Sequence, residues 1–293
     1  MPNVLVAGHV NWDVTLRIDR LPAPDAEASI RSRRQSGGGS AANVAVALAR
    51  QGVDVSLIGS VGDDEHGARL ASELEATDVD CAGVRTVEGT PTACKYLLVD
   101  DDGEVAVLGN DGANEAVRPS DVDPAVVRRA DHVHLTSQRP ETAAAIARIA
   151  RDAGIPVSFD PGRRLGDRPF DATIERADVV FATGREAEAL LGSEAGHLAF
   201  GERVVVVTAG ADGAAVHAPD ATYHHPGFDV ESVDASGAGD AFAAGFVATT
   251  CETDDLERAL RYANACGALT VRRDGARTAP SRTAVERFLA ARE

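Results

Sequence analysis

The chain has 293 residues, and its 46 acidic and 29 basic residues give a formal net charge of −17. Such a charge argues against nucleic acid and anionic membranes as partners. With 44% apolar residues the chain can build the core of one large domain, and no apolar stretch is long enough to span a membrane. The first residues lack the basic region that opens a secretory leader, so we expect a cytoplasmic protein.

The choice of basic residue also indicates the kind of organism from which the chain comes. Lys95 is the only lysine, and arginine supplies the other basic residues. An acidic surface nearly free of lysine fits a cytoplasm at multimolar salt, where screening removes the self-repulsion. A GC-rich genome would also favour arginine, but it would not by itself supply so many Asp and Glu residues. We therefore expect a halophilic, archaeal source. The four cysteines have neither metal-ligand nor disulfide spacing, so we expect them to be reduced.

Two regions of the N-terminal half predict strands that project from the main body. Residues 15–18 and 28–33 are short alternating runs around a Pro-rich turn, and residues 94–99 and 104–108 flank the turn Asp101-Asp102-Gly103. We expect insertions at about 12–36 and 92–110 of one domain that spans residues 1–293.

The rest of the chain alternates between strand and helix patterns. Buried-type strands are predicted at residues 4–8, 55–59, 133–135, 157–159, 179–181 and 204–207. Helical runs are predicted at residues 41–51, 65–76, 141–153 and 185–191. This order is typical of an α/β fold, in which a parallel sheet carries helices on both faces. Ligands of such folds bind at the carboxyl ends of the strands.

Several Gly-rich segments fall at strand ends or helix starts. Residues 37–43 open a helix and put Asn43 in its first turn, while residues 59–64 and 208–213 follow strands. Neither the dinucleotide-binding GxGxxG pattern nor the Walker A pattern is present. Each segment taken alone is better explained as a tight turn than as a ligand site.

The segment Asp234-Ala235-Ser236-Gly237-Ala238-Gly239-Asp240 precedes an apolar helical pattern. Gly237, Ala238 and Gly239 should present backbone N–H groups at a helix N-terminus, which suits an anion. Asp240 would then lie in the first turn beside that anion. A kinase needs such a pair, a base for the attacking hydroxyl and donors for the transferred phosphoryl group. The alternative is that Asp240 only favours the helix dipole and the glycines only allow close packing.

Together and in this order, the motifs resemble the ribokinase-like (PfkB) carbohydrate kinase family over essentially the whole chain. The matching segments are residues 8–13, Gly38-Gly39 with Asn43, residues 59–67, Thr208-x-Gly-x-x-Gly, residues 234–240 and Asn264. The resemblance implies a three-layer α/β/α sandwich with a mostly parallel central sheet and a small β-sheet lid. It also implies that ATP with Mg²⁺ phosphorylates a hydroxyl of a small carbohydrate, and that the lid strands join two chains in a homodimer.

The resemblance assigns roles at the matching positions. Asp240 would be the base, and the N–H groups of Gly237, Ala238 and Gly239 would form the anion hole. The positions that would hold the substrate are Asn11, Asp13, Gly38, Gly39 and Asn43. The positions that would border the nucleotide are Thr208, Gly210, Gly213 and Asn264. Asp234 would lie near a monovalent-cation site, for K⁺, in members that have one.

One segment departs from the family pattern. Members usually carry Asn-x-x-Glu before the helix that we predict at 185–191, and this motif is tied to magnesium and phosphate. Here the matching residues are Thr183 and Glu186, so Glu186 is kept and Thr replaces Asn. A threonine hydroxyl can still orient a metal-bound water, so we expect activity to survive.

Basic residues near the expected cleft leave the substrate open. Arg31, Arg33 and Arg34 precede the substrate glycines, Lys95 lies on the other inserted hairpin, Arg139 follows the strand at 133–135, and Arg163 and Arg164 follow the strand at 157–159. Converging on the cleft, they would bind a substrate phosphate or carboxylate, as in a pentose 1-phosphate, a hexose phosphate or a keto-deoxy sugar acid. As ion pairs within the lid or solvated charges, they would leave a neutral substrate such as ribose, fructose or a nucleoside.

Two further alternatives remain at this stage. Trp12 either stacks on a sugar or base, or packs at the base of the lid. The chain as a whole could also be a non-catalytic nucleotide- or sugar-binding protein on a kinase fold, since fold alone does not fix function.

Overall fold

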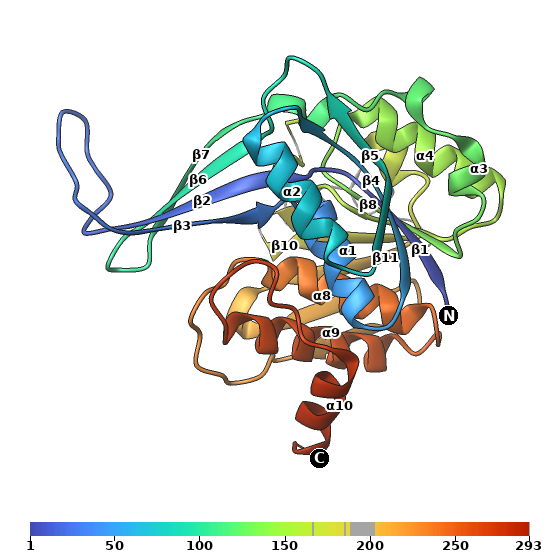
Figure 1. The fold of residues 1–293 in the computed structure, drawn as a ribbon. Coiled ribbons are helices and arrows are strands. Elements are labelled where there is room, and N and C mark those ends of the chain that lie inside the picture. Colours follow the sequence, from blue (N-terminus) through green and yellow to red (C-terminus); the bar gives the residue numbers. More distant parts are fainter. Residues whose placement is uncertain (166, 185, 188–202, 293) are drawn as a thin grey trace.

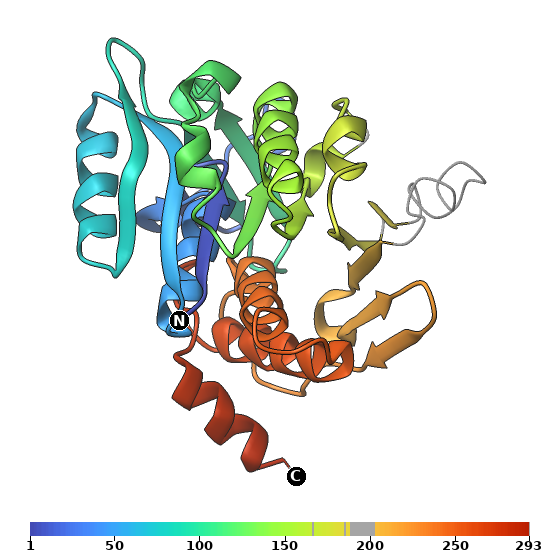
Figure 2. The ribbon, with the colours of Figure 1, turned by 90° about the vertical axis from the view of Figure 1, so that its right-hand side faces the viewer.

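The computed structural model describes residues 1–165, 167–184, 186–187 and 203–292. Its central feature is a nine-stranded sheet in the order β13-β12-β11-β10-β9-β8-β1-β4-β5 (Figures 1 and 2). The strands are β1 (Asn3–Ala7), β4 (Asp54–Gly62), β5 (Val79–Val87), β8 (His132–Thr136), β9 (Val157–Asp160), β10 (Val179–Thr183), β11 (Val204–Thr208), β12 (Ala214–His217) and β13 (Thr222–His225). From β5 to β11 in this order, each strand is parallel to the next. Strand β12 is antiparallel to both of its neighbours, β11 and β13.

Helices cover both faces of this sheet, as Figure 1 shows. They are α1 (Ser40–Arg50), α2 (Glu65–Glu75), α3 (Pro124–Val127), α4 (Pro140–Asp152), α5 (Asp171–Ile174), α8 (Ala238–Thr250), α9 (Leu256–Val271) and α10 (Arg282–Ala290). Successive side chains of β1 face opposite layers. Val4 and Val6 pack in one core cluster with α1, α8 and α9, while Leu5 and Ala7 pack in a second cluster with α4. The predicted three-layer α/β/α sandwich is confirmed.

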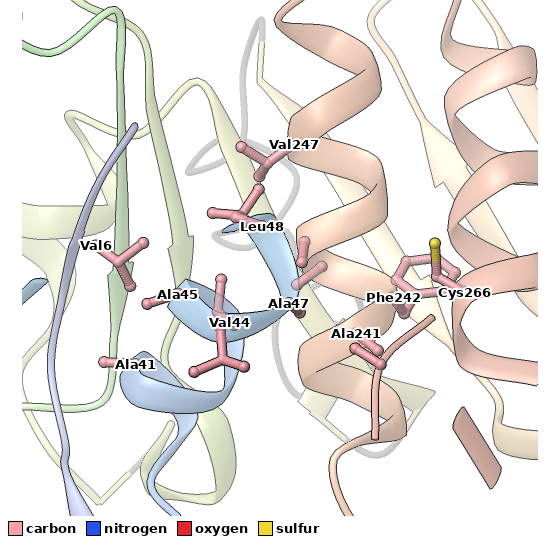
Figure 3. Packing of buried hydrophobic residues seen from close by; sticks show 14 of the residues in the cluster. Val6, Ala41, Val44, Ala45, Ala47, Leu48, Ala241, Phe242, Val247 and Cys266 are labelled. Atoms are coloured by element: carbon pink, nitrogen blue, oxygen red, sulfur yellow. The ribbon is translucent and has the colours of Figure 1, made fainter. Parts of the chain in front are cut away.

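Small side chains bring α1, α8 and α9 close together (Figure 3). Leu48 of α1 lies beside Val247 of α8, and Phe242 of α8 lies beside Cys266 of α9. A Cβ atom at Gly245 would lie only 2.7 Å from the sulfur of Cys266, so the helices could not approach this closely with a larger residue there. Because α8 is buried from Ala241 to Thr249, its first turn is fixed beside the start of α1.

The second sheet is the lid, formed by β2 (Asn11–Ile18), β3 (Ile30–Gly38), β6 (Cys94–Val99) and β7 (Val105–Asn110) in the order β3-β2-β6-β7. It extends away from the main sheet in Figure 1. Its strands come from the two segments that the sequence predicted as insertions. Alternation along β2 gives the lid two distinct faces: Asp13 and its cross-strand neighbour Lys95 share one face, and Trp12 lies on the other.

Trp12 packs at the base of the lid. Its side chain is 3% exposed, it stacks on His66 of α2 with ring centroids 5.3 Å apart, and Arg69 of α2 lies over the same ring. Of the two roles considered for Trp12, packing is therefore the one that the structure supports.

The strands and helices predicted within the described residues are present with bounds shifted by a few residues, but the sequence reading did not include β5, β13, α3, α5, α9 or α10. The helical run predicted at 185–191 lies mostly outside the described residues. Within the part of the chain that the structure describes, no helix has the length and apolar character needed to cross a membrane.

Two histidines of β8 are buried, and both contact the same serine hydroxyl. His132 Nε2 and His134 Nδ1 each lie 2.8 Å from Ser158 Oγ on β9. Burial lowers the pKa of His132 to about 4 and that of His134 to about 3, so both rings are neutral near pH 7. Their folded-state pKa values lie below the unfolded value of about 6.5.

The free energy of unfolding should therefore fall as the pH drops from about 6.5 toward 4, because the unfolded chain binds these protons first. At pH 5 the shift of His132 alone corresponds to about 2 kcal/mol. We expect His132→Asn to lessen the loss between pH 7 and pH 5 by about this amount in urea titrations at constant KCl. The exposed His224→Asn is the control. An equal loss in the wild type and in His132→Asn would contradict the assignment.

Candidate active site

The candidate base lies where two helices begin. Asp240 is in the first turn of α8, and its Oδ2 accepts a hydrogen bond of 2.8 Å from Nδ2 of Asn43, in the first turn of α1. Burial raises the pKa of Asp240 to about 6, while the Asn43 hydrogen bond and the charge of Lys95 act against that rise. A carboxylate with this pKa is mostly ionised at neutral pH and still takes a proton readily.

The turn before Asp240 has the geometry of an anion site. Gly237 has a φ of 74°, and a Cβ atom there would overlap the carbonyl oxygen of Ala276, so the position requires glycine. No side chain caps the start of α8, and a Cβ atom at Gly239 would meet only open space. The N–H groups of Gly237 and Gly239 have no backbone acceptor among the described residues. The helix dipole adds positive potential at the same point.

The predicted substrate residues meet beneath the lid. A Cβ atom at Gly38 would overlap the carboxylate of Asp13, and one at Gly39, where φ is 93°, would overlap the carbonyl oxygen of His9. Two buried polar atoms here, Asp13 Oδ1 and Asn11 Nδ2, make no hydrogen bond of good geometry within the described residues, although the Asn11 amide is close enough to act against the raised pKa of Asp13. An acceptor and a donor so placed suit the hydroxyl groups of a small polar molecule.

Three carboxylates gather at the carboxyl edge of the main sheet. Asp160 ends β9, Glu186 follows β10, and Asp240 opens α8. Burial, together with the negative charges of Asp240 and Glu186, raises the pKa of Asp160 to about 7. Glu186 accepts the backbone N–H of Thr183 at 2.7 Å. Among the described residues, no group of three His, Cys, Asp or Glu side chains forms a preformed metal site.

The predicted nucleotide residues lie along the next strands of the same edge. Thr208 ends β11 beside Thr183 of β10, and Gly210 and Gly213 follow with φ values of 62° and 83°. A Cβ atom at Gly213 would overlap the carbonyl oxygen of His225, which explains glycine there. Asn264 is buried in α9, where its amide donates to the carbonyl of Leu260 at 2.8 Å.

Asp234 is already paired with an arginine of the lid. Arg34 Nη2 lies 2.9 Å from Asp234 Oδ2, and Arg34 Nη1 lies 2.9 Å from Asp274. Although burial acts to raise the pKa of Asp234, hydrogen bonds from the N–H groups of Ser236 and Gly275 and the charge of Arg34 lower it overall. A monovalent cation near Asp234 stays a prediction.

The structure does not bring Arg31 or Arg33 to the site. Arg31 is exposed and pairs with Asp101 in the β6–β7 turn at 2.7 Å. Arg33 lies opposite Leu16 on β2, and so on the lid face that Asp13 does not share. For these two arginines the alternative, a lid ion pair or a solvated charge, fits the geometry.

The other basic residues predicted to bind the substrate differ in whether they already have a partner in the protein. Arg139 donates twice to the carbonyl oxygen of Glu115, at 3.2 and 3.0 Å, and Arg163 is exposed in the 3-10 turn after β9. The side chain of Arg164 lies outside the described part. Lys95 is half-buried on the Asp13 face of the lid, and its charge acts on both Asp13 and Asp240.

The sequence reading missed two groups at the site. Asp160 stands at a strand end, where the rule for ligands of parallel sheets would have selected it. Arg277, between α9 and α10, contacts Asn43, Glu73 and the carbonyl of Gly38. No motif marks Arg277, because its contacts come from segments far apart in the sequence.

Comparisons with known proteins cover nearly the whole chain. A family model described as pfkB family carbohydrate kinase matches residues 1–284. The ATP-dependent ribose-1-phosphate kinase of Halopiger xanaduensis is 64% identical over 294 residues, covering 100% of this chain and 99% of the relative. The ribokinase of Bacillus subtilis is 31% identical over 299 residues, covering 99% and 100%. The structure of Arabidopsis thaliana ribokinase complexed with ribose and ATP matches with a TM-score of 0.88 at 28% identity, covering 98% of each chain.

Asp240→Asn removes the charge but keeps the shape, so we expect normal folding and a loss of turnover of about 10³-fold or more. Thermal unfolding and steady-state kinetics would measure the two effects. The exposed Asp220→Asn is a matched control. Turnover near that of the wild type would exclude Asp240 as the base.

Proposed function

The chain belongs to the pfkB family of carbohydrate kinases and is an ATP-dependent sugar kinase, and on that premise we propose that its sugar is ribose 1-phosphate. The γ-phosphoryl group of ATP would pass to the primary hydroxyl on C5 as the bond to the β-phosphate breaks, giving ribose 1,5-bisphosphate and ADP. The 64% identity to a ribose-1-phosphate kinase over the full chain supports this substrate. The observation on the molecule itself that carries the proposal is the position of Lys95.

Lys95 supplies a positive charge over the sugar site. It stands on β6 opposite Asp13 of β2, on the lid face toward Gly38. Burial raises the pKa values of Asp13 and Asp240, and the charge of Lys95 acts against that rise. The ammonium therefore lies within electrostatic reach of both carboxylates. With the described residues it makes no ion pair of 4 Å or less. An anionic group on the sugar would match this charge.

Three arginines of the lid and of the segments around it also favour Lys95 as the phosphate-binding cation, because they are paired with carboxylates. Arg31 is paired with Asp101, Arg34 with Asp234 and Asp274, and Arg168 with Glu115. Their charges are therefore balanced within the protein. Lys95 is the cation most available to a phosphate beside Asp13, and Arg163, exposed at the carboxyl edge, is the second candidate.

Different residues would position the sugar, take its proton and bind the transferred phosphoryl group. Asp13 and Asn11 hold sugar hydroxyls and thereby aim the C5 hydroxyl at Asp240, which takes its proton as the oxygen attacks. The backbone N–H groups of Gly237 and Gly239 bind the oxygens of the phosphoryl group in transfer. The N–H of Ala238, which the sequence assigned to the same anion hole, donates instead to the carbonyl oxygen of Ala235 at 3.3 Å. The lid excludes water, which would otherwise compete as acceptor.

The acidic edge fits a magnesium ion that arrives with the nucleotide. Asp160 and Glu186 supply the hard oxygen donors that Mg²⁺ prefers, and Mg²⁺ is commonly held by one or two carboxylates together with substrate phosphates. Burial and the like charges of Asp240 and Glu186 raise the pKa of Asp160, and a divalent cation would offset those charges. When bound, Mg²⁺ would neutralise charge on the phosphates.

The lid also offers a surface for a second copy of the chain. Its large exposed apolar residues are Ile30, Tyr96, Val105, Val107 and Leu108. Strands β3 and β7 are the unpaired edges of the lid sheet, and exposed apolar edges favour association. We therefore propose a homodimer through the lid. A cytoplasmic location stays a prediction.

Lys95→Met should raise KM for ribose 1-phosphate about 30-fold, because a charge-assisted hydrogen bond contributes about 2 kcal/mol. KM for ATP and for ribose should change little. Arg31→Met, an exposed lid cation changed in the same way, is the control. Coupled assays in KCl with ATP would measure all three constants. Equal changes for ribose and ribose 1-phosphate, or turnover confined to neutral sugars or nucleosides, would contradict the substrate assignment.

Glu186→Gln should raise the Mg²⁺ concentration for half-maximal activity about 10-fold, since it removes charge from the edge where the metal would bind. The exposed Glu257→Gln on α9 is the control. Identical magnesium titrations of Glu186→Gln and the wild type would remove Glu186 from the site.

Leu108→Glu should convert a dimer into a monomer by placing a charge on the apolar lid surface. Light scattering after size-exclusion chromatography in KCl would report the mass. A monomeric wild type would refute the lid dimer.

A further inference from the structure

Arg277 connects three segments that meet at the site. Its side chain is 14% exposed and donates in three directions. Nε points to Oδ1 of Asn43 on α1 at 3.3 Å, Nη1 to Glu73 of α2 at 3.1 Å, and Nη2 to the carbonyl oxygen of Gly38 at 3.2 Å. The guanidinium is therefore held in one orientation at the junction of α1, α2 and the end of β3.

The chemistry of these partners allows only one orientation of the Asn43 amide. A guanidinium can donate but not accept, so the side of Asn43 that faces Arg277 must be the carbonyl oxygen. An ionised carboxylate can accept but not donate, so the side that faces Asp240 must be the NH₂ group. The observed distances, 3.3 Å and 2.8 Å, fit this arrangement. Arg277 thus keeps the donor of Asn43 pointed at Asp240.

The residues next to Arg277 contact the other half of the site. The N–H of Gly275 donates to Asp234 at 3.0 Å, and the carbonyl oxygen of Ala276 lies against Gly237. Segment 275–277 therefore touches the turn of the anion hole on one side and the partner of the base on the other. Glu73 extends the connection, because its carboxylate also accepts the N–H of Gly37 at 3.0 Å.

We propose that Arg277 is a positioning residue for phosphoryl transfer, which fixes the Asn43 amide and thereby holds the Asp240 carboxylate in register with the anion hole. The inference rests on Asp240 as the base of the kinase. It does not depend on which sugar supplies the hydroxyl, so any sugar that the enzyme turns over can be used to test it.

The test is a double-mutant cycle between Arg277→Met and Asn43→Ala. Arg277→Met alone should lower kcat about 10-fold to 100-fold, part of what a positioned base supplies, while KM for ATP changes by less than about threefold. Arg277→Lys keeps the charge and one donor, so it should recover part of kcat. Arg50→Met is the control, because Arg50 is an arginine that also donates to a backbone carbonyl, that of Ala279 at 2.9 Å, away from the site.

In the Asn43→Ala background, Arg277→Met should lower kcat by less than about threefold, because the amide through which it acts is absent. The same fold-loss in both backgrounds, or an unchanged kcat in Arg277→Met, would overturn the proposal. If Arg277→Met unfolds in thermal scans, Arg277→Lys replaces it in the cycle, and its smaller loss of kcat should likewise shrink in the Asn43→Ala background. Failure of ribose 1-phosphate as a substrate would refute only the substrate assignment, since the cycle can then be run with the accepted sugar.

Discussion

The hydrogen bond between Asn43 and Asp240 is the interaction on which the site depends. It joins the first turns of α1 and α8, two helices that both begin in Gly-rich segments at the same edge of the structure. The two helices approach closely because their buried faces consist mainly of alanine and valine. A larger residue would move the base away from its partner, so the small-residue core and the chemistry are parts of one constraint.

The electrostatics of the site differ from those of the chain as a whole. A net charge of −17 belongs to the surface and suits a salt-rich solvent. In the site, partly buried carboxylates have pKa values raised to about 6 at Asp240 and about 7 at Asp160. Such groups require cations close by. Arg277 pairs with Glu73 and donates to Asn43, Lys95 stands opposite Asp13 on the lid, and Arg34 pairs with Asp234 and Asp274. In the function that we propose, this arrangement leaves Asp240 ionised near neutral pH, where it can act as the base, and leaves the charge of Lys95 for the substrate.

The sequence predicted the strand and helix alternation, the lid insertions and the Asp234–Asp240 turn because these features are local and periodic. It failed where position depends on tertiary contacts. Arg31 and Arg33 are close in sequence to the glycines predicted to bind the substrate. However, Arg31 lies far enough along β3 to pair with Asp101 in the β6–β7 turn, and strand alternation places Arg33 on the opposite face of the lid from Asp13. Arg277 has no local signal, since its partners are more than two hundred residues away in the chain. Lys95 was recognisable as the only lysine, but its place opposite Asp13 required the register of β2 and β6.

A crystal structure of the protein with ribose 1-phosphate and a non-hydrolysable ATP analogue tests the central claim most directly. The account predicts that the C5 hydroxyl lies about 2.6–3.2 Å from a carboxylate oxygen of Asp240. It also predicts that the γ-phosphate lies over the N–H groups of Gly237 and Gly239, and that the 1-phosphate contacts Lys95. A sugar bound with C5 directed away from Asp240, or with its phosphate away from Lys95, would contradict the account.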